Sequence, residues 1–350
     1  MDDFSRLCAF ENLYQAHLKT RLGKRHKAEV IRFETDLGQK LVLLSDLLQS
    51  DAYLPVKYFH FKVFEPKERD IHALRYPDRV VQRCLCDQVL SPLIEPRLIF
   101  DDAACRRGKG MHFSLERLAG FMRGHYRCFG TEGYYLKCDI SKYFQSIDHE
   151  VLKQLLERLP TSDHMRSFLH GVVDSFELSP GKGLPLGNQS SQLFALFYLD
   201  PIDRLVKEKL GIKHYVRYMD DFILIHPDKS YLVECRKQIE KMLESQLQLR
   251  LNSKTQLAPL NQGIHYLGFI FRLTETGKVV RRIVPATKKR IVKSLRMIDK
   301  GLARGIISEK KTAQTLASYL GHLQHGDCQS IVSEVRWCMK KSAAQLEDQI

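Results

Sequence analysis

Three aspartates stand out in this 350-residue sequence because their type and placement could carry out chemistry. Asp139 closes an apolar, strand-like segment, and Asp220 and Asp221 form a pair between two apolar runs. An isolated Asp-Asp pair is usually only a turn. Three carboxylates drawn together would need cations among them, and oxygen ligands favour Mg²⁺ or Mn²⁺ over zinc. Two such ions about 3.5–4 Å apart can serve phosphoryl transfer.

The elements around these aspartates predict a shared sheet. Residues 133–140 alternate as a strand, which places Asp139 on the same face as Lys137. Residues 214–226 form two apolar runs around a polar pair, a pattern that predicts a β-hairpin. A strand end and a hairpin tip can be neighbours in an antiparallel sheet, so the three carboxylates can meet.

Further patterns predict helices and strands along the rest of the chain. The expected helices cover residues 4–21, 79–94 (disturbed by Pro92), a segment capped by Asp148, and 231–249, and the expected strands cover 56–64 and 264–273. This order is not a series of βαβ units, and it contains neither Gly-x-Gly-x-x-Gly nor a P-loop. A dinucleotide-binding or P-loop fold is therefore disfavoured.

The composition favours a nucleic-acid partner without requiring one. Lys and Arg number 55 and Asp and Glu 41, so the net charge is +14. Such a balance suits a polyanion, although an ordinary basic protein could share it. The longest apolar run, residues 193–199, is too short for a bilayer, which needs about 20 residues. We therefore expect no membrane association. The nine cysteines include no Cys-x-x-Cys pair, so we expect reduced thiols and a cytoplasmic setting.

Over about residues 60–325 the chain resembles the reverse transcriptases. Each motif is weak alone, but their common order is specific. The segments that carry the resemblance are Pro66-Lys-Glu-Arg69 and Arg79-Val-Val-Gln82 of the fingers, the loop Cys105-Arg-Arg-Gly-Lys-Gly110, motif A Lys137-Cys-Asp-Ile-Ser-Lys-Tyr-Phe144, motif B Gly183-Leu-Pro-Leu-Gly-Asn-Gln-Ser-Ser-Gln192, motif C Tyr218-Met-Asp-Asp221, motif D Leu251-Asn-Ser-Lys-Thr-Gln-Leu257 and motif E His265-Tyr-Leu-Gly-Phe269.

This resemblance implies an α+β fold of the right-hand polymerase type. The fingers would cover residues 1–130 with part of 165–190. The palm, an antiparallel sheet backed by helices, would cover 131–275. A basic, helical thumb would cover 276–350.

The resemblance also implies an RNA-directed DNA polymerase that adds deoxynucleoside triphosphates to a primer. Asp139 and Asp220 would hold two Mg²⁺ ions, with Mn²⁺ as an alternative. Asp221 lies beside them, and the backbone carbonyl of Ile140 would be a further ligand. No covalent protein intermediate is needed.

Other residues of the motifs would bind the incoming nucleotide. Lys67 and Arg69 would clamp the triphosphate, although a solvated loop would look the same. Lys254 would neutralise or protonate the pyrophosphate, unless it is only a surface lysine. Phe144 would pack under the sugar and exclude a 2′-hydroxyl, unless it is only a core residue. The motif B residues expected at the nucleotide are Leu186, Gly187 and Gln192.

The basic stretch after motif E would follow the phosphates of an RNA–DNA hybrid, and binding would then weaken steeply with salt. A solvated basic helix is the alternative. The residues expected to contact nucleic acid are Arg281, Arg282, Lys288, Lys289, Arg290 and Lys293.

Within the family, motif B is most like that of diversity-generating retroelements. An aliphatic Leu186 before the glycine and Ser-Gln at the end are features of that group, as is Arg217-Tyr-Met-Asp-Asp. The group copies a template RNA into cDNA with errors opposite adenine, and the cDNA replaces a variable repeat (mutagenic retrohoming). A small basic accessory protein works with these enzymes. Leucine at 186 cannot hydrogen-bond near the nucleotide, and about 1.4 kcal/mol less discrimination is a tenfold change in error.

Two alternatives remain open at the level of sequence. A retron or phage-defence reverse transcriptase would share the chemistry with a different RNA. A polymerase-like binding module would have lost catalysis, which the intact aspartates and the retained Lys67 and Arg69 argue against.

Overall fold

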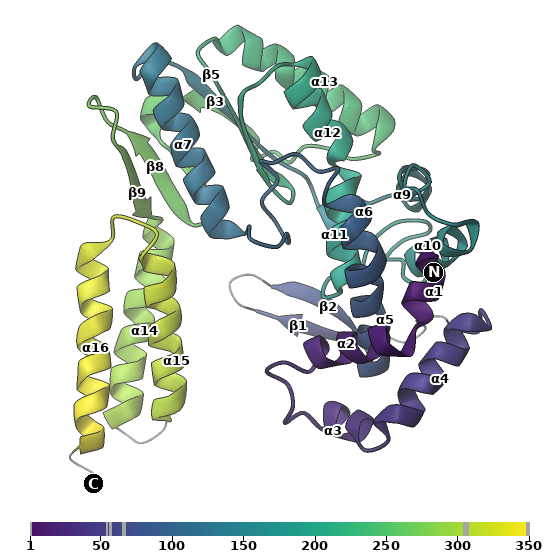
Figure 1. Cartoon of the computed structure of the whole chain (residues 1–350). Coiled ribbons are helices and arrows are strands. Elements are labelled where there is room, and N and C mark those ends of the chain that lie inside the picture. Colours follow the sequence, from purple (N-terminus) through teal and green to yellow (C-terminus); the bar gives the residue numbers. More distant parts are fainter. Residues whose placement is uncertain (1, 54, 56–57, 65–67, 304–307, 348–350) are drawn as a thin grey trace.

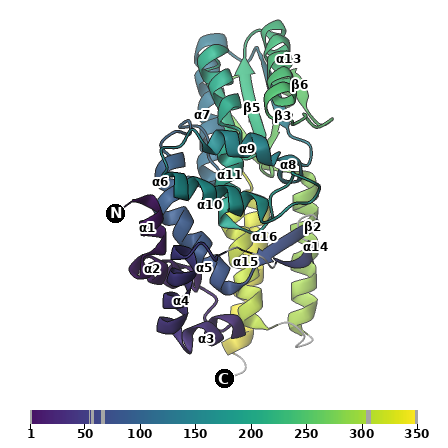
Figure 2. The same cartoon turned by 90° about the vertical axis from the view of Figure 1, so that its right-hand side faces the viewer.

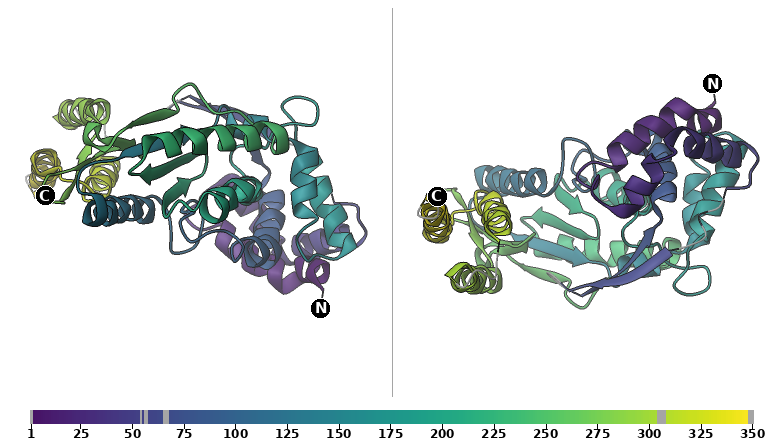
Figure 3. Two further views of the ribbon diagram at one scale, coloured as in Figure 1. Left: turned by 90° about the horizontal axis from the view of Figure 1, so that it is seen from above. Right: turned by 90° about the horizontal axis from the view of Figure 1, so that it is seen from below.

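A central antiparallel sheet organises the molecule, with helices on both faces and a helical lobe at each end (Figures 1 and 3). The computed structural model describes residues 2–53, 55, 58–64, 68–303 and 308–347. In Figure 1 the C-terminal helices hang at the left and the N-terminal helices at the right, both below the sheet. Figure 2 views the molecule from the N-terminal side. The architecture is the α+β class that the sequence predicts.

The central sheet has the strand order β4-β5-β3-β6, and each pair is antiparallel. Its strands are β3 (Tyr134–Asp139), β4 (His214–Tyr218), β5 (Asp221–His226) and β6 (Gln256–Pro259). The predicted strand at 133–140 and the predicted hairpin at 214–226 are confirmed. The edge strand β6 was not expected, because its four residues lack a clear alternation.

The two faces of this sheet belong to two separate apolar cores. Leu136 and Cys138 of β3 pack with one side of helix α13 (Lys229–Gln246). Tyr135 and the β5 residue Ile223 pack on the opposite face with helix α7 (Met111–Phe129). Successive side chains of each strand therefore point into the two cores in turn, as expected for a sheet that is buried on both faces. Helix α7 lies within residues 1–130, the range expected for the fingers, but it packs on one face of the central sheet (Figure 1).

The N-terminal lobe is built from short helices and one hairpin. Its elements are α1 (Asp3–Cys8), α2 (Phe10–Thr20), α3 (Ala28–Glu34), α4 (Leu37–Gln49), β1 (Tyr58–Val63), β2 (Arg69–Leu74), α5 (Tyr76–Leu85), the π-helical segment η1 (Cys86–Leu90) and α6 (Ser91–Ile94).

One local prediction in this lobe is wrong in detail and another agrees with the structure. The single helix expected over 4–21 breaks at Ala9, whose backbone is extended, so two helices form. The helix expected over 79–94 forms as α5, η1 and α6, and the π-helical η1 lies directly before Ser91 and Pro92, where the sequence predicts a disturbance.

Further helices connect and back the sheet. They are α8 (Tyr143–Ser146), α9 (His149–Leu156), α10 (Asp163–Asp174), α11 (Gln189–Tyr198), α12 (Asp200–Arg204), the π-helical η2 (Leu205–Lys209), and the short 3₁₀ turn η3 (Leu260–Gln262). Asp148 caps α9 as predicted, because its carboxylate accepts from the backbone amides of Glu150 and Val151 at 3.1 and 3.2 Å.

The C-terminal lobe begins with a second sheet and ends in three helices. Its elements are β7 (Ile264–Tyr266), β8 (Phe269–Leu273), β9 (Val279–Ile283), α14 (Pro285–Ala303), α15 (Glu309–Leu323) and α16 (Gln329–Glu347). The single strand expected over 264–273 is instead a hairpin that turns at Leu267, which has a φ of 44°. Within the described residues, no helix combines the length and apolar character that a membrane crossing requires.

Candidate active site

The β3–β5 pairing brings the predicted aspartates together. Asp139, the last residue of β3, is the direct antiparallel partner of Asp221, the first residue of β5. Asp220 precedes Asp221 in the two-residue turn between β4 and β5, where Met219 has a φ of 57°. Direct partners point to the same face of a sheet, so the Asp139 and Asp221 carboxylates share the face that α7 and β7 border.

Asp221 is tied to a neighbouring cation. Lys137 Nζ lies 3.3 Å from Asp221 Oδ2 and also donates to the carbonyl oxygen of His265 at 2.8 Å. Burial raises the pKa of Asp221 to about 6, and Lys137 opposes that rise. Lys137 therefore joins motif A, motif C and the β7–β8 hairpin of motif E.

Asp220 lies in a similar electrostatic environment. Burial raises the pKa of its carboxyl, and the nearby charge of Asp139 raises it further. Arg69, an exposed residue at the start of β2, and the buried Arg217 oppose this shift. The predicted triphosphate clamp residue Arg69 therefore lies within electrostatic reach of the turn. Its predicted companion Lys67 lies outside the described residues.

Motif D is fastened directly to the end of motif A. The amide of Asn252 donates to the Asp139 carbonyl at 2.7 Å, and Ile140 forms an isolated bridge with Leu251. Two residues later, Lys254 is exposed and its amide donates to the Asn252 side chain at 3.1 Å. Backbone contacts thus connect Asp139, at the end of β3, with the segment that carries Lys254, the lysine predicted to neutralise pyrophosphate.

Motif B is fastened to motif A and to the β1–β2 hairpin. The Phe144 carbonyl accepts from the amide of Leu184 at 2.8 Å, and the Leu186 carbonyl accepts from the amide of His72 at 3.0 Å. Gly187 has a φ of 117°, and a Cβ there would lie 3.0 Å from Ile71. This position therefore requires glycine.

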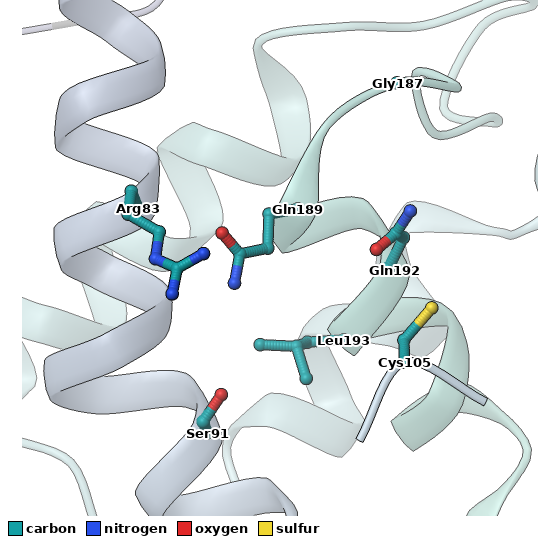
Figure 4. A pocket seen from close by; sticks show the side chains of 7 residues that line it. All are labelled: Arg83, Ser91, Cys105, Gly187, Gln189, Gln192 and Leu193. Carbon is teal, nitrogen blue, oxygen red and sulfur yellow. The ribbon is translucent and has the colours of Figure 1, made fainter. Parts of the chain in front are cut away.

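Two predicted nucleotide-binding residues line a hollow beside the N-terminus of α11. Gly187 and Gln192 border a cavity of about 400 Å³ together with residues of α5, α6 and the Cys105 loop. Figure 4 shows Arg83 and Ser91 on one helix, facing Gln189 and Leu193 of α11, with Cys105 on a separate loop. The complete lining is Arg83, Ser91, Cys105, Gly187, Gln189, Gln192 and Leu193.

The predicted thumb residues lie apart from this cluster, in the C-terminal lobe (Figure 1). Arg281 of β9 is half-buried and pairs with Glu116 of α7 at 2.5 Å, so its charge is partly satisfied within the protein. The other five residues are exposed on β9 and α14: Arg282, Lys288, Lys289, Arg290 and Lys293.

The three carboxylates fit a divalent cation by their chemistry. They offer only oxygen ligands, and Asp221 Oδ1 is buried without a hydrogen-bond partner. Within the described parts of the chain, no three His, Cys, Asp or Glu side chains already converge as a finished metal site. A cation held by Asp139, Asp220 and Asp221 would relieve the mutual repulsion that raises the pKa values of Asp220 and Asp221.

Comparison with known proteins decides the family. The family described as reverse transcriptase (RNA-dependent DNA polymerase) matches residues 67–271, more than half of the chain. The chain belongs to the reverse transcriptase family. The α+β right-hand polymerase fold that the sequence predicts is therefore the fold of this chain.

Two solved telomerase structures resemble this reverse transcriptase. One is telomerase from Candida albicans in complex with a TWJ fragment of telomeric RNA (TM-score 0.47, 14% identity, covering 89% of this chain and 65% of that one). The other is apo telomerase from Candida tropicalis, truncated from its C-terminal domain (TM-score 0.47, 14% identity, covering 65% and 54%). The present chain spans less than two thirds of either telomerase chain. Comparison with curated proteins gives no match.

Sequence reasoning did not assign roles to two residues that the structure places at the site of this reverse transcriptase. Lys137 appears only as a letter of motif A, although its alternation with Asp139 already placed the two on one face. Arg217, directly before motif C, is fully buried and bonded to Asp102 and Asp203. A charged residue inside a run of apolar strand residues is the signal that could have identified it.

Proposed function

We propose that this reverse transcriptase copies a template RNA into cDNA by two-metal phosphoryl transfer. The observation that carries the proposal is the pairing of Asp139 with Asp221 across β3 and β5, with Asp220 in the adjoining turn. In a member of this family, such a carboxylate cluster suits addition of deoxynucleotides to a primer end. The central sheet would be the palm, the N-terminal lobe the fingers and the C-terminal lobe the thumb.

The residues of the palm would act by binding and positioning. Asp139, Asp220 and Asp221, with the Ile140 carbonyl, would hold two Mg²⁺ ions. When bound, Mg²⁺ lowers the pKa of the primer 3′-hydroxyl and offsets the charge of the triphosphate. Lys137 keeps the Asp221 carboxylate ionised and oriented beside the cluster.

The residues of the fingers and of motif D would handle the nucleotide. Arg69 would bind the triphosphate with its planar guanidinium, together with Lys67. Lys254 would neutralise the departing pyrophosphate. Phe144 would lie under the sugar, where its ring excludes a 2′-hydroxyl and selects deoxynucleotides.

The thumb would hold the RNA–DNA hybrid. The cations of β9 and α14 supply positive charge without a nearby run of acids, which suits phosphate contacts. We also expect a small basic accessory protein that helps to bind the template RNA.

We further propose that the enzyme belongs to a diversity-generating retroelement of a bacterium or phage and drives mutagenic retrohoming. Support comes from Leu186, whose carbonyl is held by His72 while its side chain offers no hydrogen bond. A polymerase with fewer polar checks on the nascent pair has smaller energy differences between correct and incorrect nucleotides. The resemblance to that group implies that the errors concentrate opposite template adenines.

Primer extension on a defined RNA template tests both proposals. The purified chain is supplied with Mg²⁺ and the four deoxynucleotides, Asp220→Ala serves as the blank, and the products are sequenced. Leu186→Gln is the matched variant, for which we expect about tenfold fewer errors opposite adenine.

The outcomes separate the candidates. cDNA from wild type only, with errors at adenines, supports both proposals. Accurate or evenly erroneous cDNA keeps the polymerase and favours a retron or phage-defence enzyme. Absence of cDNA, even with a cognate RNA and accessory protein, would favour a non-catalytic nucleic-acid-binding module.

A further inference from the structure

Arg217 is a fully buried cation close to the turn that Met219 and Asp220 form between β4 and β5. It lies on β4, its exposed fraction is 0%, and two carboxylates bind its guanidinium. Its Nε donates to Asp203 Oδ1 at 2.8 Å and its Nη2 to Asp203 Oδ2 at 2.6 Å. Nη2 also donates to Asp102 Oδ2 at 2.8 Å. The planar guanidinium is therefore fixed on two sides.

The remaining donors of Arg217 reach the backbone of the site. Nη1 donates to the carbonyl of Met219 at 3.1 Å, and Nη2 donates to the carbonyl of Leu196 in α11 at 3.2 Å. Met219 has a left-handed φ of 57°, a conformation that is unfavourable for residues other than glycine. The carbonyl that Arg217 holds belongs to the same peptide unit as the amide of Asp220. Holding this carbonyl therefore orients the backbone that carries the Asp220 carboxylate.

The same arginine connects the turn to the loop that leads into the Cys105 segment. Its backbone amide donates to the Asp101 carbonyl at 3.1 Å, and its carbonyl accepts from the amide of Ala103 at 3.0 Å. Asp102, between them, supplies one of the two counter-charges. Three parts of the chain that are distant in sequence thus meet at one side chain: this loop, α11–α12 and the turn.

Stabilisation of the core alone is the competing explanation, and it is weak. A buried ion pair often adds little net stability over apolar residues of similar volume, because desolvation offsets the attraction. A purely structural role also does not require the bond to the Met219 carbonyl. The network is therefore better explained by the geometry that it imposes on the turn.

We propose that Arg217 is a positioning residue of the polymerase site, which holds the Met219 carbonyl and thereby sets the Asp220 carboxylate for cation binding. Asp203 and Asp102 keep the guanidinium in the required plane. The inference rests on the proposed function for its catalytic consequence, but its geometric content concerns cation affinity alone.

The test compares Arg217→Met and Arg217→Lys with wild type, and uses Arg204→Met as the matched control. Arg204 lies on α12 nearby, but it is half-exposed and pairs with Asp200 and Glu208. Mn²⁺ binding is followed by the decrease of the free-ion electron paramagnetic resonance signal, with Asp220→Ala as the blank. Steady-state extension gives kcat and the dNTP KM, and fluorescence anisotropy gives the affinity for primer–template. Thermal unfolding reports folding.

For folded Arg217→Met we expect about tenfold weaker Mn²⁺ binding and a kcat lower by about 10²-fold, the effect typical of a misplacement of about 1 Å. The dNTP KM and primer–template affinity should stay within twofold of wild type. Arg217→Lys should recover part of both effects, because lysine keeps the charge but cannot span Asp203 and Met219 together. Arg204→Met should match wild type.

Wild-type Mn²⁺ affinity and kcat in folded Arg217→Met would overturn the proposal. If Arg217→Met does not fold, Arg217→Lys decides: Mn²⁺ binding weakened at least threefold supports the proposal, and unchanged binding rejects it. If wild type binds Mn²⁺ but makes no cDNA, the proposed function fails, while the Mn²⁺ measurements still judge the positioning role. Wild type that binds no more Mn²⁺ than Asp220→Ala would reject both.

Discussion

Asp139 and Asp221 are direct partners across β3 and β5, although one belongs to motif A and the other ends motif C. The register explains why the site needs no long side chains to gather its carboxylates. Adjacent antiparallel strands place partner side chains about 4.5–5.5 Å apart at Cβ, within range of a shared cation. The cost is repulsion between like charges, which raises the pKa values of Asp220 and Asp221 in addition to the effect of burial.

Lys137 counters this repulsion, so its removal should slow synthesis. Lys137→Met leaves Asp221 without its ion pair and the His265 carbonyl without its donor. We expect kcat to fall about tenfold and primer–template affinity to weaken, because a hydrogen bond to a charged group contributes about 1.5–3 kcal/mol. Steady-state extension measures kcat, and fluorescence anisotropy measures the affinity for primer–template. Lys229→Met, a change at an exposed lysine on α13, is the control, and equal rates in the two variants would contradict the assigned role.

Phe144 should determine the choice of sugar. Phe144→Ala opens the space expected under the ribose, so incorporation of ribonucleotides should rise relative to deoxynucleotides by roughly 10–100-fold. The ratio of kcat/KM for dGTP and GTP on one template gives the result. Phe129→Ala changes an exposed aromatic residue of α7 and should leave this ratio at the wild-type value. A ratio that does not move in Phe144→Ala would leave Phe144 with a packing role only.

The cations of α14 should control the salt dependence of hybrid binding. Replacing Lys288, Lys289 and Arg290 together by alanine should make the slope of log K against log salt shallower, by about 0.9 for each phosphate that these side chains neutralise. Fluorescence anisotropy with an RNA–DNA hybrid over a range of salt concentrations measures this slope. A double alanine variant of Lys237 and Lys241, exposed on α13, should keep the wild-type slope. If the α14 variant and the α13 variant both keep the wild-type slope, the hybrid does not contact these residues of α14.

His214, on β4, should make the stability of the central sheet sensitive to acid. Burial, together with the nearby positive charges of His125, Lys207, Lys213 and His226, lowers its pKa from 6.5 to about 4. Between these two pH values the unfolded chain binds a proton that the folded chain does not. The stability contributed by neutral His214 is therefore complete above pH 6.5 and declines as the pH falls toward 4.

The decline should be about 1–2 kcal/mol between about pH 6.5 and pH 4.5, since partial exposure screens the effect. Urea unfolding at several pH values follows it. His214→Gln should flatten this part of the stability profile, whereas His26→Gln, a change at an exposed histidine of the N-terminal lobe, should not. A profile that keeps its slope in His214→Gln would show that other groups carry the acid sensitivity.

Local patterns were sufficient to predict much of the central sheet. Alternation in 133–140 and the paired apolar runs of 214–226 predicted β3 and the β4–β5 hairpin, and both formed. Strand alternation depends only on neighbouring residues, so it can be read along the chain. The single helix expected over 4–21 was wrong because the chain changes direction at Ala9, and α1 and α2 pack separately. Such a change depends on tertiary packing, which the periodicity of the residues does not report.

The sequence by itself determined which groups can do the chemistry, because the order of the motifs and the identity of Asp139, Asp220 and Asp221 are properties of the chain. Tertiary structure decided which partners these groups have. The pairing of Lys137 with Asp221, the placing of α7 on the sheet, and the two carboxylates around Arg217 all join segments that lie far apart. Such contacts depend on how whole elements pack, and a buried charge accepts whichever counter-charge that packing brings within reach.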